Sequence, residues 1–322
     1  MASFAKIVLA ALAVSVAACA AGAEEYPARP LRIIVPYAAG GPSDTAARLV
    51  SEPLSRQLGV SVVVENRGGA GGLVATEAYT REQPDGYTIL LGAIGPFAVI
   101  PAGKHVSYDV EKDFVPLGCI WFSGQALVVN AKLPVKTLGD FIAYAKANPG
   151  KVTVGSAGIG AVSHLTLELL KREAGIDLVH VPFRSSGAAL PNIIGGQVDG
   201  TIGDASVLAP QVDSGALRAL AVASSTRAPA LPAVPTMKEE GLPGVIAESW
   251  FGLVVSSQTP PAIVERLQAA LAAAQKNSAY LESLNRQKAS FGEPGADSFA
   301  QLIRRDAEKW RHVIQAAGIR FD

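Results

Sequence analysis

The sequence predicts an α/β protein whose strands and helices form two lobes. Apolar, β-branched runs alternate with helical patterns along the chain, which favours parallel strands with helical crossovers. A strand, a glycine-rich loop and a helix also follow one another once in each half, over residues 31–47 and 151–172. A helix N-terminus after such a loop presents backbone N–H groups and a positive dipole to an anion. An ordinary strand-to-helix turn fits either segment alone, but the second copy favours two loops that hold one small carboxylate between the lobes.

Length and composition set the class of protein. The chain has 322 residues, enough for two hydrophobic cores, and it is 49% hydrophobic and only 17% charged, which is typical of a globular protein. Its 28 basic and 28 acidic residues balance, and no basic stripe indicates nucleic-acid binding. The four histidines lack the spacing of a metal site, and we expect no cofactor.

The pattern of residues 1–23 predicts a signal peptide. Lys6 precedes an apolar run over residues 7–18 that is too short to span a bilayer, and Ala21-Gly22-Ala23 fits a cleavage site. Alternatively, the segment that ends at Cys19 resembles a lipobox, in which case Cys19 carries a lipid. Either reading predicts export to the periplasm. Simple cleavage leaves Cys119 without a disulfide partner, as a small core residue.

The first lobe begins with the predicted strand 31–35. Its glycine loop ends at Ser43 or Asp44, either of which suits a helix N-cap, and the helix runs to about residue 58 with Pro53 inside it. A strand over 60–65, a helix over 73–82 and a strand over 87–91 follow. The apolar stretch 114–129 then carries the chain into the second lobe.

The second lobe repeats the pattern. We expect helices over 137–148, 161–172 and from Ser185 or Ser186 to about 195, with strands over 151–155, 178–181, 198–202 and 217–223. The proline-rich segment 228–244 predicts an extended connection. A strand over 250–255 returns to the first lobe, where helices over 260–276, 278–287 and 296–317 pack. Hinge crossings are expected near residues 122–128 and 244–252.

Polar residues near the two loops are the candidate ligand contacts. His164 is either a donor in the cleft or a packing residue. Arg184 suits a bidentate contact with a carboxylate or a surface role, whereas Asp204 accepts from a ligand or, as we slightly favour, caps the next helix. The full candidate set is Gly40, Gly41, Ser43, Asp44, Ser156, Ala157, Gly158, Ser163, His164, Arg184 and Asp204.

Ordered motifs give the mature chain a family resemblance. They are Pro30-Leu31-Arg32-Ile33-Ile34-Val35-Pro36, Gly40-Gly41-Pro42-Ser43-Asp44, Val64-Glu65-Asn66-Arg67, Asp85-Gly86-Tyr87-Thr88, Ser156-Ala157-Gly158, Ser163-His164-Leu165, Val181-Pro182-Phe183, Gly195-Gly196-Gln197-Val198-Asp199 and Val234-Pro235-Thr236. From about Tyr26 onwards, the sequence resembles the solute-binding receptors of tripartite tricarboxylate transporters, the Bug or TctC-type proteins.

The resemblance implies a type II periplasmic-binding fold of two doubly wound lobes with a ligand cleft between them. We assign residues 24–124 and 249–322 to lobe 1 and residues 125–248 to lobe 2, and we expect a monomer whose lobes close about the hinge crossings. The resemblance further implies a protein that binds a small organic acid, delivers it to membrane permease subunits and catalyses nothing.

Departures from the family pattern concern the ligand. Ile159 and Ala161 stand where polar residues are usual, Gly68 replaces a proline, Arg184-Ser185 replaces Lys-Gly, and Ala205 follows Asp204 in place of Asn. The rival class is an exported serine hydrolase that uses Ser156 or Ser163. A Ser156–His164–Asp204 triad can be drawn, but no GxSxG turn supports it.

Overall fold

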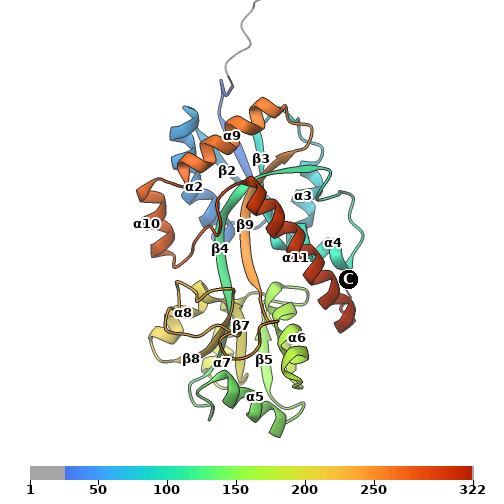
Figure 1. Ribbon diagram of the computed structural model, residues 1–322, viewed down its shortest axis with the longest axis vertical. Coiled ribbons are helices and arrows are strands. Elements are labelled where there is room, and N and C mark those ends of the chain that lie inside the picture. Colours follow the sequence, from blue (N-terminus) through green and yellow to red (C-terminus); the bar gives the residue numbers. More distant parts are fainter. Residues whose placement is uncertain (1–25, 321–322) are drawn as a thin grey trace, which may run out of the picture.

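The computed structural model describes residues 26–320 and shows two lobes joined by long strands (Figure 1). The expected signal peptide and Cys19 lie outside the described residues. One continuous path of paired strands runs β2-β1-β3-β9-β4-β7-β5-β6, with β8 on β4. In the described part of the chain, no helix is both long and apolar enough to cross a membrane.

The first lobe has the predicted parallel core. Strand β1 (Leu31–Val35) lies between β2 (Val62–Asn66) and β3 (Thr88–Ala93), parallel to both. Because side chains alternate along a strand, Ile33 and Ile34 face opposite sides of this sheet and join different apolar clusters. One face packs against α2 (Pro42–Leu58), α9 (Pro261–Ala274) and α10 (Ser278–Arg286). The other packs against α3 (Leu73–Tyr79), which follows the short turn η1 (Ala70–Gly72), and against η2 (Gly95–Val99) and α4 (Ile100–Gly103).

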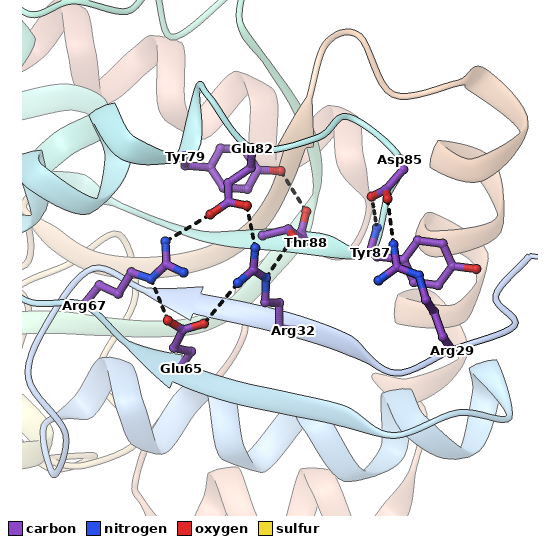
Figure 2. A network of polar contacts seen from close by, with 9 residues as sticks. All are labelled: Arg29, Arg32, Glu65, Arg67, Tyr79, Glu82, Asp85, Tyr87 and Thr88. Carbon is purple, nitrogen blue, oxygen red and sulfur yellow. Dashed lines mark hydrogen bonds and ion pairs between the residues drawn. The ribbon is translucent and has the colours of Figure 1, made fainter.

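A network of partly exposed charged side chains links β1, β2 and the loop before β3 (Figure 2). Arg32 of β1 contacts Glu65 of β2 and Glu82 of the loop before β3, and Arg67 binds the same two carboxylates at 2.7 and 3.0 Å. The charges of the two arginines and the two glutamates therefore cancel. The hydrogen bond from Arg67 holds the pKa of Glu65 below its usual value. The network ties β1 and β2 to the loop before β3, although partly exposed pairs stabilise a fold only modestly.

Two long strands connect the lobes. Strand β4 (Phe114–Asn130) pairs with β9 (Glu248–Ser256) as far as Gly124, and from Gln125 onwards it pairs with β7 and β8. The prediction that residues 114–129 carry the chain between the lobes is confirmed. All these pairings are antiparallel, and β9 is also antiparallel to β3, whereas the alternating pattern predicted parallel pairing. The difference arises because β4 leaves the first lobe and β9 returns to it in the opposite direction.

The second lobe is built on β7 (Gly200–Asp204), β5 (Thr153–Ser156) and β6 (Val179–Pro182), which are parallel. Strand β8 (Leu217–Ala223) lies on the other edge of β4. The predicted helices are present as α5 (Leu138–Ala147), α6 (Val162–Ala174), α7 (Ser186–Ile194) and α8 (Ala205–Asp213). Residues 228–244 form no helix or strand apart from an isolated bridge at Thr236, as their prolines predict.

The last helix, α11 (Ala296–Ala317), has the predicted bounds, but it contacts both lobes and not the first lobe alone. Its apolar face packs against β4, η2 and α4 of the first lobe, and Phe299 meets the ring of Trp250 edge-on. It also contacts α6 of the second lobe, where Leu165 and Leu169 belong to the same apolar cluster. The expectation that α11 packs on the first lobe is therefore correct but incomplete.

Candidate functional site

The first glycine loop joins β1 to α2 and is held by its own aspartate. The N–H of Gly40 donates to Asp44 Oδ2 at 3.0 Å, and Arg48 Nε lies 3.0 Å from Oδ1. Burial opposes the charged form of Asp44, but the bonds from Arg48 and Gly40 prevail and keep its pKa below the usual value. The prediction that Ser43 or Asp44 is the N-cap is wrong: Gly41 occupies that position because Pro42 starts the helix.

The second glycine loop joins β5 to α6 and is held by three side chains. Ser163 Oγ accepts from the N–H of Ala157 at 2.9 Å, and His164 Nδ1 accepts from the N–H of Gly160 at 3.1 Å. Ser156 is fully buried, and its hydroxyl accepts from the N–H of Gly158. The loop is therefore fixed before any ligand arrives, while Ile159 at its tip is 65% exposed.

A histidine that the sequence reasoning missed supports this loop. His180 of β6 places Nε2 2.6 Å from Ser156 Oγ, and its ring stacks on His164 with the centroids 4.0 Å apart. Burial, followed by nearby positive charge, lowers the pKa of each histidine to about 4, so both are neutral at pH 7. The sequence did contain a pattern that could have identified His180. Strand β6 follows the glycine loop and its helix in the chain, and neighbouring parallel strands bring their carboxyl ends together.

We expect this histidine pair to make stability depend on pH. The unfolded chain takes up protons near the ordinary histidine pKa of 6.5, whereas the folded protein resists protonation until about pH 4. The pair therefore destabilises the fold progressively as pH falls from about 6.5 to about 4. His180→Asn keeps a hydrogen-bonding side chain without titrating, so its Tm should fall less than that of wild type between pH 7.5 and pH 4.5. Exposed His312→Asn is the control, and equal losses in all three proteins would contradict this role.

Asp204 lies at the carboxyl end of β7, beside the crossing strands. It occupies the N-cap position of α8, but its side chain makes no capping hydrogen bond, so the favoured capping role is wrong. Instead, Gln125 Nε2 donates to Asp204 Oδ1 at 2.8 Å and to Ser249 Oγ at 3.0 Å. Burial raises the pKa of Asp204.

The remaining candidates are not all brought together. Ser43 is buried at the start of α2, in the first lobe, whereas Arg184 is exposed on the loop between β6 and α7. Within residues 26–320, the Arg184 guanidinium has no hydrogen-bond or ion-pair partner. Ser156, His164 and Asp204 do not form a triad, because His164 contacts Gly160 and Asp204 contacts Gln125. Burial raises the pKa of Cys119 to about 12, in keeping with a core residue.

A large pocket lies on the other side of the crossing strands. It measures about 710 Å³, and its walls include Glu248, residues 224–229 and the first turns of α11, but none of the predicted site residues. Glu248 and Ser249 are neighbours on β9, so their side chains point to opposite faces. The pocket is therefore distinct from the surface that carries Ser249 and Asp204.

Comparison with known proteins places the chain among solute-binding proteins. The model of the "Tripartite tricarboxylate transporter family receptor" matches residues 46–319. Protein BugT of Bordetella pertussis is 35% identical over 301 residues, which cover 93% of this chain and 92% of that protein. An R. palustris protein solved with adipate is 31% identical, with a TM-score of 0.80 over 92% of this chain and 99% of that one. MatC of Rhodopseudomonas palustris with bound malate is 33% identical, with a TM-score of 0.76 over 90% of this chain and 100% of that one.

Proposed function

The chain belongs to the tripartite tricarboxylate transporter receptor family, and we propose that it captures a small organic acid between its lobes and delivers it to a membrane permease. Relatives solved with adipate and malate support a carboxylate ligand. We further propose that residues 1–23 export the chain to the periplasm, with lipidation at Cys19 as the alternative, and that it works as a monomer.

The observation that carries the proposal is the matched pair of glycine loops. Each loop follows a parallel strand and opens a helix, α2 in one lobe and α6 in the other. First-turn N–H groups of a helix lack acceptors within it and favour an anion. The loops are held by Asp44 and by Ser163 and His164, so they are organised in advance. The free guanidinium of Arg184 supplies a positive charge beside the second loop.

Lobe closure would bring the two loops onto one ligand. We propose that lobe 1 comprises residues 24–124 and 249–322 and lobe 2 comprises residues 125–248. This division follows the point where β4 changes partner, between Gly124 and Gln125, and the start of β9 at Glu248. A hinge of two strands permits rigid-body closure around a ligand.

The hydrolase alternative rests on the contact between Ser156 and His180. Two features oppose it: the Ser156 side chain is fully buried, and in the described part of the chain no carboxylate orients the His180 ring by a hydrogen bond. A serine nucleophile needs access to substrate and an oriented base. Turnover of small ester substrates by the purified protein, lost in Ser156→Ala, would favour the hydrolase.

A panel of organic acids tests the receptor function. We expect at least one small carboxylate, with adipate and malate in the panel, to raise Tm in a concentration-dependent way, because a ligand that binds only the folded state stabilises it by RT ln(1 + [L]/Kd). Chloride at equal ionic strength is the control. No shift with any acid, together with ester turnover, would overturn the proposal.

Lobe closure can be measured on the same protein, saturated with the acid that raises its Tm. Small-angle scattering should give a smaller radius of gyration with the stabilising acid than without it, because the lobes approach each other. An unchanged radius at saturation would contradict closure, although not binding.

A further inference from the structure

We propose that Asp204, Gln125 and Ser249 select ligands whose far end, away from the glycine loops, donates a hydrogen bond through an ammonium or hydroxyl group. The inference rests on the proposed function and refines it. An acid with a second ionised carboxylate at that end would be disfavoured. The class of ligand is therefore an amino or hydroxy monocarboxylate.

The three side chains come from three strands at the lobe junction. Gln125 pairs in register with Asp204 where β4 enters the second lobe, and Ser249 lies on β9 opposite Ser123. Gln125 is only 2% exposed, and its amide nitrogen binds both Asp204 Oδ1 and Ser249 Oγ. The Ser249 hydroxyl also lowers the pKa of Asp204, which offsets part of the effect of burial. The strands therefore fix the position of the Asp204 carboxylate.

The cluster lies on the face of β9 that leads to the first glycine loop. Ser249 and Phe251 are two residues apart on a strand, so their side chains share one face. The ring of Phe251 packs edge-on against Tyr37, which directly follows Pro36 at the end of β1, with the centroids 6.5 Å apart. Tyr37, Phe251, Ser249 and Asp204 thus form a stripe that runs from the first loop to the end of β7. A ligand whose carboxylate lies at the loops would turn its other end toward this stripe.

The charge on this stripe determines which chemical groups of a ligand it can bind. The Gln125 amide that binds Asp204 is neutral, and among residues 26–320 no Lys, Arg or His forms an ion pair with Asp204. A carboxylate has about four acceptor positions, so Asp204 keeps acceptor capacity for a ligand. Burial raises the pKa of Asp204, because its surroundings solvate the charged carboxylate poorly and no cation offsets that cost. An ammonium or hydroxyl group would satisfy Asp204, whereas a second carboxylate would oppose it.

Matched acids test the inference on the purified protein. The four-carbon series is butyrate, 4-hydroxybutyrate, 4-aminobutyrate and succinate, and a five-carbon series extends it with glutarate as the diacid. Calorimetry should show that the hydroxy or amino acid binds wild type at least about tenfold more tightly than the unsubstituted acid and the diacid. Comparison of the hydroxy-substituted acids with the amino-substituted acids then shows which donor group the protein prefers.

Asp204→Asn removes the negative charge at nearly constant size. It should weaken binding of the preferred donor-bearing acid by about tenfold or more and reduce its preference over the diacid. Asp177→Asn, an exposed carboxylate change in the same lobe, is the matched control and should alter neither value.

Two results would overturn different claims. If wild type prefers succinate, glutarate or adipate over every hydroxy and amino monocarboxylate, the inference is wrong but the receptor function stands. If wild type binds none of these acids and turns over small esters, the proposed function itself is wrong.

Discussion

Gly41→Asp is expected to abolish binding of the organic acid while leaving the fold intact. Gly41 has an extended backbone with φ of −90°. Among residues 26–320, an added Cβ would meet only the Ala38 carbonyl oxygen beyond its chain neighbours, at 4.0 Å, so a side chain fits without strain. The new carboxylate would stand at the N-terminus of α2, where the ligand anion is proposed to lie. Two like charges about 4 Å apart repel by about 4 kcal/mol near a protein surface, which corresponds to a loss of roughly 100-fold to 1,000-fold in affinity.

Gly41→Asn is the matched control, because it has the same size without the charge. We expect Gly41→Asn to weaken binding much less, and Ser43→Ala to cost about 0.5–1.5 kcal/mol as the loss of a single hydrogen bond. Ala157→Asp places a carboxylate in the second glycine loop and should weaken binding for the same reason. Calorimetric titration with one acid, supported by circular dichroism, measures all four variants. If the two aspartate variants bind like wild type, the anion does not lie between these loops.

Asp306→Ala is expected to be the most destabilising of the substitutions discussed. Asp306 is 1% exposed and accepts from Trp250 Nε1 at 2.8 Å and from Lys309 Nζ at 2.9 Å. Its removal leaves a buried indole N–H without an acceptor and a half-buried ammonium without its partner. We expect a loss of about 2–4 kcal/mol in the free energy of unfolding and a fall in Tm of roughly 5–10 °C.

Glu308→Ala is the control for Asp306→Ala, because it removes a carboxylate from an exposed position two residues along α11. Its effect should stay within about 0.5 kcal/mol. Calorimetric melting and urea unfolding both measure the difference. Equal stability of the two variants would mean that the contact between Trp250 and Asp306 does not anchor α11 on β9.

Much of the fold was predictable because it depends on local pattern. The run from Leu31 to Val35 forms the predicted strand, and α11 spans the predicted residues 296–317. Thr137 and Ser185 each cap the helix that they were expected to begin. In these segments, periodicity and capping preferences act over a few residues, so distant contacts are not needed to define them.

Local rules failed where two preferences competed. At the start of α2, Ser43 and Asp44 have good capping side chains, but Pro42 fits the first helical turn and moves the N-cap to Gly41. At α8, Asp204 stands at the N-cap position, but the amide of Gln125 competes successfully for its carboxylate. Both outcomes depend on neighbours that a capping rule does not include.

The sequence by itself determined the α/β class, the two strand–loop–helix units and the family resemblance that comparison with known proteins bears out. Only the tertiary structure decided that β4 and β9 pair antiparallel, that α11 reaches the second lobe, that His180 supports Ser156, and that Gln125 joins Asp204 to Ser249. The physical reason is separation along the chain: Gln125 and Ser249 are 124 positions apart, and they meet only because β4 and β9 lie side by side. Strand and helix patterns report local preference, whereas the contacts at the proposed site depend on how distant elements pack.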